Sequence, residues 1–356
     1  MGQYWQLICP ELQLTFGNWG KLGESLFDGT PEAIIERIAI PQPGPWVRAK
    51  LSPVPPSFPD SASPLINLPP ELLNEIIARL PLQDLFVLAL CSQQLYYTCR
   101  SRIVSILASL CGQLAGTSLI CVGDYLEPGD YPPGIDWMPE IEELEKQLAS
   151  ILDNEGEAGS EDEDEYDDSF RSAKANPNLN SYADAFYEVV PDELGASRNM
   201  IAAHGDDNTW ETVYLNSGKY LPDNLNHEYH HLSFFVSRSF YPKDLEWVLR
   251  NLTTKEYVRH SVVCPSANAS APFSSYRGVG LGHFLLSRIC WSSDPSTAMS
   301  WDGIHRGIWA GHKFDITTIK AIEGDDSWKD VSIEGYEELK AIWKSEYGDE
   351  WEERLL

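Results

Sequence analysis

A five-residue run, His227-Glu228-Tyr229-His230-His231, has the residue types and the spacing of a zinc-dependent hydrolase. On a helix, His227 and His231 would lie on one face and could bind one metal ion. Glu228 would then stand beside the metal-bound water and could take a proton from it. This run is the pattern in the chain that most directly suggests catalysis.

The sequence on either side of this run does not favour a helix. Turn-forming residues occupy 222–226, and the apolar run 232–236 that follows is typical of a strand. We therefore expect a loop with three histidines, no enzymatic activity, and no metal or other cofactor. A zinc hydrolase that uses His227, Glu228 and His231 is kept as the alternative.

The only other side chain singled out for chemistry is Ser160, a candidate phosphorylation site. It precedes four acids, a context that acidophilic protein kinases favour, but an unmodified serine in solvent is an equal alternative. Ser160 lies in the run 153–168, which holds ten acids and no base. Such a run repels itself and holds few apolar residues, so we predict a disordered acidic linker over 153–179.

Residues 68–103 have the apolar spacing of three short helices. One face of the first helix is defined by Leu72, Leu73, Ile76, Ile77 and Leu80. Prolines stand where the first two helices would begin, at 69 and at 81. Three helices in about forty residues bury too little apolar surface to be stable alone, so this region is expected to need a partner surface.

The same region resembles an F-box. About a dozen positions carry the resemblance: Leu68, Pro69, Glu71, Leu72, Ile76, Leu80, Pro81, Asp84, Leu85, Leu88, Cys91 and Ser92. The resemblance implies that these residues dock on the linker subunit of an SCF-type cullin–RING E3 ubiquitin ligase. It also implies that the rest of the chain presents a protein substrate, as an adaptor rather than an enzyme. An F-box protein that acts outside ubiquitylation remains a second alternative.

Four further stretches are similar to a group of F-box proteins found in filamentous fungi. They are residues 1–5, 19–24, 120–125 and 309–316. This wider resemblance covers most of the chain, but it implies no catalytic activity and no substrate.

Composition excludes several other classes of function. The formal net charge of -28 disfavours binding to nucleic acid and to anionic membranes, because both need clustered Lys and Arg. The uncharged stretch 103–122 is interrupted by Gly112 and Gly116, so we do not expect it to span a membrane. Seven cysteines without a Cys-x-x-Cys pair fit a reducing compartment, so we expect the cytoplasm, the nucleus or both.

These patterns together predict an α+β protein without repeats. An ordered N-terminal segment covers 1–40, and a linker with eight prolines covers 41–64. The F-box follows at 65–105, and a strand and a helix at 106–152 are expected to pack on the C-terminal domain. After the acidic linker, a Trp-rich α+β domain covers 180–356 and is the expected substrate-recruiting region; within it, residues 261–264 have a strand pattern.

Overall fold

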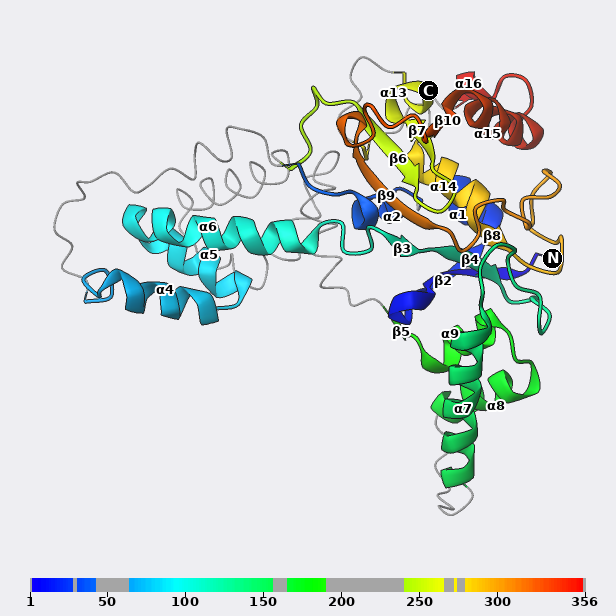
Figure 1. The fold of residues 1–356 in the computed structure, drawn as a ribbon, viewed down its shortest axis with the longest axis horizontal. Helices are drawn as coiled ribbons and strands as arrows, with labels where there is room; N and C mark the ends of the chain where they lie inside the picture. The colour runs from blue at the N-terminus through cyan, green and yellow to red at the C-terminus, as the bar shows by residue number, and fades with distance from the viewer. Residues whose placement is uncertain are drawn as a thin grey trace. The chain divides into compact units, whose positions relative to one another are not determined.

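The computed structural model describes residues 2–27, 31–42, 64–155, 165–189, 240–265, 272–273 and 279–354. The chain divides into two compact units, each of which is described by itself. Unit 1 comprises Met1–Ala39, Leu114–Val190 and Leu245–Leu356, and unit 2 comprises Ile40–Gln113 and Pro191–Asp244. The described residues form a mixture of helices and strands without a repeat, which confirms the predicted α+β class (Figure 1).

The first sheet of unit 1 has the strand order β5-β2-β1-β4-β8. Its strands are β1 (Tyr4–Cys9), β2 (Leu14–Lys21), β4 (Ile120–Gly123), β5 (Glu188–Val189) and β8 (Cys290–Trp291). The central strand β1 pairs antiparallel with β2 and with β4, and β4 pairs parallel with β8. One sheet therefore joins residues from the start, the middle and the end of the chain.

The second sheet of unit 1 has the order β10-β7-β6-β9-β3. Its strands are β3 (Thr117–Ser118), β6 (Trp247–Asn251), β7 (Glu256–Arg259), β9 (Lys313–Thr318) and β10 (Lys329–Asp330). Strands β6 and β7 form an antiparallel hairpin, and β9 pairs with β6 on its other side. Short 3-10 helices follow β1 and β9, at Pro10–Leu12 and Ile319–Ala321.

Helix α14 (Leu281–Ile289) lies in the main core of unit 1. It contacts four other helices of this unit: α1 (Leu22–Phe27), α2 (Glu32–Ile38), α13 (His260–Val263) and α15 (Ser332–Tyr347). Its apolar residues occur all around the helix, which is typical of a fully buried helix. Helix α15 packs closely on it, because a side chain at Gly335 would overlap the ring of Phe284. The short helix α16 (Trp351–Arg354) follows α15.

A second core forms where three helices pack against the first sheet. These helices are α7 (Met138–Glu155), α8 (Glu165–Ala175) and α9 (Leu179–Phe186). The core combines Ile8, Ile120 and Val122 of the strands with Leu144 and Tyr182 of the helices. Burial of an apolar face against a sheet explains why α7 is stable despite its many acidic residues.

The predicted disordered linker over 153–179 is wrong for residues 165–179. Helix α8 occupies most of this stretch and buries Phe170 and Ala173, and the ring of Phe170 contacts that of Phe186 edge-on with centroids 5.3 Å apart. The burial of these two residues, which lie at helical spacing, explains why a stretch that begins with acids is helical. Residues 153–155 form the end of α7, and 156–164 lie outside the described residues.

Two further expectations differ from the structure. Residues 261–264 were expected to be a strand, but His260–Val263 form one helical turn closed by a 2.8 Å bond from the Cys264 N–H to the His260 carbonyl. The buried positions 260 and 263 have helical spacing, which overrides the strand propensity of the valines. The boundaries drawn at 40, 106 and 180 also do not separate folded units, because β1, β4 and β8 belong to one sheet.

Several local predictions are confirmed. The strand and the helix expected within 106–152 are β4 and α7. Helix α15 ends at Gly348, whose φ of 82° lies in the left-handed region that favours glycine. Among the described residues, no helix has both the length and the apolar character needed to cross a membrane.

Candidate partner-binding site

Helix α4 (Pro70–Arg79) begins at the proline pair that the sequence pattern singled out. Pro69 is the N-cap residue, with φ -50° and ψ 139°, and Pro70 is the first helical residue. A proline fits this position because its fixed φ suits a helix and its missing N–H would have no partner there. The first helical bond runs from the Leu73 N–H to the Pro69 carbonyl, at 3.1 Å.

Helix α5 (Leu82–Cys91) begins in the same way, after Pro81. The Leu85 N–H donates to the Pro81 carbonyl at 3.0 Å. Asp84 lies in the first turn and is exposed, where its negative charge interacts favourably with the helix dipole. The exposed thiol of Cys91, the last residue, donates to the Val87 carbonyl at 3.2 Å.

Helix α6 (Gln93–Leu110) is the longest of the three and extends beyond the predicted end at 103. The Ser92 hydroxyl oxygen caps it by accepting a bond from the Leu95 N–H at 3.2 Å. Leu95, Cys99 and Ile103 follow at four-residue spacing and are all buried. Burial, with a smaller effect from Cys91, raises the pKa of the Cys99 thiol to about 11, so this thiol is protonated and has a packing role.

Among the side chains that the structure describes, seven apolar residues of the three helices are buried. They come from all three: Leu73, Ile77, Leu85, Ala89, Leu95, Cys99 and Ile103. Leu85 is completely buried, so among the predicted docking residues it is the one that holds the helices together. Leu68, Leu80, Leu88 and Ser92 are half-buried, and Pro69, Glu71, Pro81, Asp84 and Cys91 are exposed.

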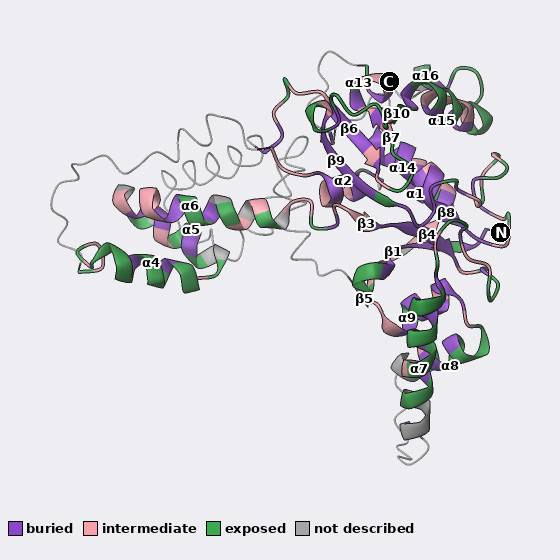
Figure 2. Ribbon diagram, in the orientation of Figure 1, coloured by how far each residue is buried: buried purple, intermediate pink, exposed green. Residues whose placement is uncertain are grey.

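The outer side of these helices carries large apolar side chains in solvent. Leu72 is 54% exposed, Ile76 is 38% exposed and Val87 is 45% exposed. Figure 2 shows that exposed residues make up much of α4. Leu72 and Ile76 are one helical turn apart, so their side chains are neighbours on α4. Beside them, Glu75 and Arg79 form an exposed ion pair with a 2.6 Å N–O distance. An apolar centre with charged residues at its rim is typical of a protein-binding surface.

The comparison with known families decides what this helical region is. Residues 65–106 match the family model of the F-box domain. The chain carries an F-box domain. No curated protein and no solved structure matches the chain, so the wider resemblance to the fungal group stays a prediction.

The other candidate residues from the sequence cannot be placed. His227, Glu228 and His231 lie outside the described residues, as do Ser160 and the predicted strand at 232–236. Within the described ranges, no group of three or more His, Cys, Asp or Glu side chains is arranged to hold a metal ion.

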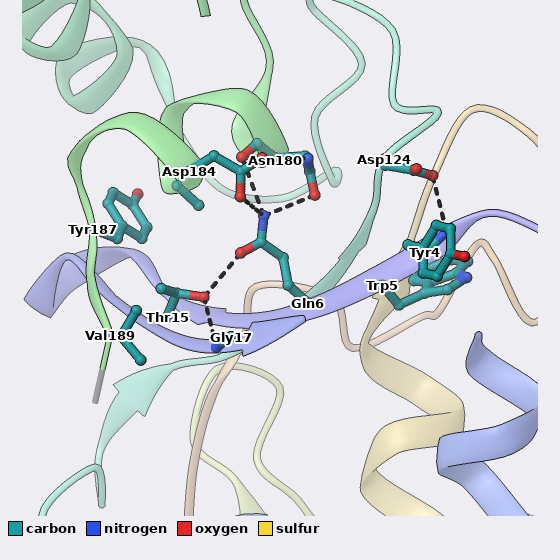
Figure 3. Close-up of a pocket in the computed structure, with 11 residues that line it drawn as sticks. Tyr4, Trp5, Gln6, Thr15, Gly17, Asp124, Asn180, Asp184, Tyr187 and Val189 are labelled. Carbon is teal, nitrogen blue, oxygen red and sulfur yellow. Dashed lines mark hydrogen bonds between the residues drawn. The ribbon is translucent and has the colours of Figure 1, made fainter. Parts of the chain in front are cut away.

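Unit 1 holds a second candidate site that no sequence pattern indicated. A pocket of about 320 Å³ lies between the first sheet and α9. Its lining comes from both: Tyr4, Trp5, Gln6, Thr15, Gly17, Asp124, Asn180, Ala183, Asp184, Tyr187 and Val189. The residues are scattered over some 185 positions, and only the fold brings them together (Figure 3). Tyr4, Trp5 and Asp124 lie in two stretches of the wider resemblance, 1–5 and 120–125, which implied no site.

A hydrogen-bonded chain of polar side chains forms the floor of this pocket and runs from buried Thr15 and Gln6 to half-buried Asn180 and exposed Asp184. The Thr15 hydroxyl donates to the Gln6 carbonyl oxygen at 2.9 Å. The Gln6 amide nitrogen donates to Asp184 Oδ1 and to Asn180 Oδ1, both at 2.9 Å (Figure 3). Gln6 and Thr15 are only 6% and 5% exposed. Such a network holds the Asp184 carboxylate in a fixed orientation at the pocket.

Proposed function

We propose that this protein is a substrate receptor of an SCF-type cullin–RING E3 ubiquitin ligase. Its F-box docks on the linker subunit of the ligase, and unit 1 recruits a protein substrate. The observation that carries the proposal is the exposed apolar surface of Leu72, Ile76 and Val87 within the segment that matches the F-box domain. The chain acts as an adaptor, and the ligase machinery supplies the chemistry.

The energetics of α4 support a docking role. Full burial of a Leu or Ile side chain stabilises a complex by roughly 1.5–3 kcal/mol, and both side chains face water in the chain alone. Apolar anchors at the centre of an interface commonly contribute about 2 kcal/mol or more each. A linker subunit that covers Leu72 and Ile76 would therefore gain roughly 4 kcal/mol from one turn of α4.

The decisive experiment removes these two anchors without touching the helix start. At about 2 kcal/mol for each anchor, Leu72→Ser with Ile76→Ser, in the full chain, should weaken binding to the purified linker subunit by roughly a thousandfold, measured by calorimetry. The matched control is Ile333→Ser, which removes a 71% exposed apolar side chain from α15 in unit 1. The control should bind as tightly as the unmodified chain.

The opening pair gives a second, less clean variant. Leu68→Ala with Pro69→Ala should also weaken docking, but Pro69 additionally caps α4. Circular dichroism must therefore show unchanged helix content in both double variants. Unchanged affinity in the folded Leu72 and Ile76 variant would refute the docking role. Tight linker binding without assembly on the cullin would favour an F-box protein that acts outside ubiquitylation.

A further inference from the structure

The pocket of unit 1 contains negative charge and no positive charge. Among its lining residues, Asp124 and Asp184 are ionisable acids, and neither Lys, Arg nor His is present. Within the described residues, neither carboxylate takes part in an ion pair. Asp184 Oδ1 accepts from the Gln6 amide and Asp184 Oδ2 from the Asn180 amide, at 2.9 and 3.2 Å. Asp124 Oδ1 accepts from the Tyr4 backbone N–H at 3.0 Å.

These bonds leave acceptor capacity on both acids. An ionised carboxylate offers about four acceptor positions, and the neutral N–H donors fill only part of them. Burial raises the pKa of Asp184 above its ordinary value; the Gln6 bond lowers it, and the charge of Asp124 raises it. Burial also raises the pKa of Asp124. The pocket thus presents two carboxylates, half-buried Asp124 and exposed Asp184, without a counter-charge in its lining, and a cation placed there would interact favourably with both.

We propose that this pocket binds a basic side chain, lysine or arginine, of a protein partner. The cationic head would lie between Asp184 and Asp124, and the aliphatic stem would lie along the pocket's aromatic walls. The pocket is at the lower end of the roughly 300–1,000 Å³ range of ligand sites, a size for one side chain rather than for a folded element.

The aromatic residues of the pocket fit such a ligand. Tyr4 and Tyr187 stand on opposite sides of the polar floor (Figure 3). Tyr4 is 50% exposed, so its ring is open to an incoming group. Burial raises the pKa of Tyr187, which therefore stays a neutral phenol. Aromatic faces attract Lys and Arg heads and also cover their apolar stems.

The charge of the whole chain acts in the same direction. A formal net charge of -28 attracts basic partners over distance and repels acidic ones.

Gln6 is a positioning residue for this pocket, because its amide fixes Asp184 and is itself fixed by Thr15. The reading of the pocket as a substrate-recruiting site rests on the proposed ligase function, whereas its preference for a cation does not.

The test uses the full chain and four probes of defined chemistry. The first three are acetylated, amidated Gly-Gly-X-Gly-Gly peptides in which X is Lys, Arg or Gln, and the fourth is n-butylamine. Titrations are followed by chemical-shift changes of the Gln6 side-chain amide. The Lys or Arg peptide should bind saturably and at least about tenfold more tightly than the Gln peptide and than n-butylamine.

Asp184→Asn and Asp124→Asn, made separately, should each weaken that binding by about tenfold or more, because each removes one charge. The asparagine oxygen can still accept the bond from Gln6 at position 184 and the bond from the Tyr4 N–H at position 124. Asp326→Asn, an exposed acid outside the pocket, removes the same charge and should leave affinity unchanged.

The proposal is overturned by equal binding of the Gln peptide, by an equal loss in Asp326→Asn, or by the absence of saturable binding. Binding of n-butylamine as tightly as the peptide would overturn the assignment to a protein side chain. Affinity for the linker subunit, measured on the same variants, should not change. A failure of the pocket is thereby distinguished from a failure of the docking function.

Discussion

Helices α4 and α9 have similar apolar patterns but meet different surroundings. In α9, the apolar residues Leu179, Tyr182 and Ala183 are all buried against the strands and helices of unit 1. In α4, Leu73 and Ile77 are buried, whereas Leu72 and Ile76 face solvent. An amphipathic helix in a finished domain uses its whole apolar face within the chain. A helix that keeps part of this face in water is suited to a partner.

The largest predicted effect on stability comes from truncating the side chain of Phe170. This side chain is 3% exposed and connects α8 to α9 through the ring of Phe186. Phe170→Ala should lower the free energy of unfolding by about 3–5 kcal/mol, because it leaves a cavity in the core. Leu72→Ala should change stability by no more than about 0.5 kcal/mol. Urea unfolding of both variants gives the measurement; equal losses would mean that Leu72 is not an exposed docking residue.

An intermediate effect distinguishes the helix caps of the two units. Asn178 caps α9 by accepting from the Ser181 N–H at 2.9 Å, and its amide donates to the Leu126 carbonyl at 2.7 Å. Asn178→Ala should cost about 2–3 kcal/mol, because it leaves buried groups without partners. Ser92→Ala at the start of α6 should cost about 1 kcal/mol, since a single capping bond is lost. Thermal unfolding gives the melting temperatures of the two variants. A larger drop for Ser92→Ala than for Asn178→Ala would contradict the predicted difference between the two caps.

The smallest effect concerns acid stability in unit 1. Asp130 accepts two hydrogen bonds from the Arg306 guanidinium, both with N–O distances of 2.7 Å. These bonds hold the pKa of Asp130 below its ordinary value. A lowered folded-state pKa adds stability above the unfolded pKa near 4, and this stability is lost as the pH falls through the folded value. Arg306→Gln should therefore flatten the fall in stability below about pH 4, measured by urea unfolding at several pH values. The Glu75–Arg79 pair on α4 is exposed and serves as the comparison. Glu75→Gln should change the free energy of unfolding by less than about 0.5 kcal/mol.

Patterns that are local in sequence predicted the F-box well and the rest of the molecule only in part. Prolines at helix starts and apolar residues at helical spacing are complete within some thirty residues, so α4 and α5 could be predicted from the chain alone. The first sheet could not be, since Cys121 pairs with Leu7 on one side and with Cys290 on the other. Strand pairing over such separations leaves no signal in any short window of one sequence.

The pocket could not be predicted for the same reason. Gln6 and Asp184 are polar residues in two elements that single-sequence patterns treat as unrelated, and their 2.9 Å bond exists only after the sheet and α9 pack. The acidic surroundings of α8 hid its buried Phe170 in a related way. In both places a few inward-facing side chains determine the structure, while the composition of the segment reports mainly its solvent-facing side.

The order of strands in the first sheet has a consequence for synthesis on the ribosome. Strand β1 is made before the F-box, whereas β8 at Cys290–Trp291, which completes its sheet, is made long after it. The F-box segment, 65–106, emerges long before that. At a translation rate of roughly 5–20 residues per second, the nascent chain carries its F-box for on the order of 10–40 s before the sheet can close. During that interval the apolar side chains of β1, which the finished fold buries, are still open to solvent and rely on chaperones for cover. If the F-box docks on a linker subunit as proposed, it can do so before unit 1 is complete.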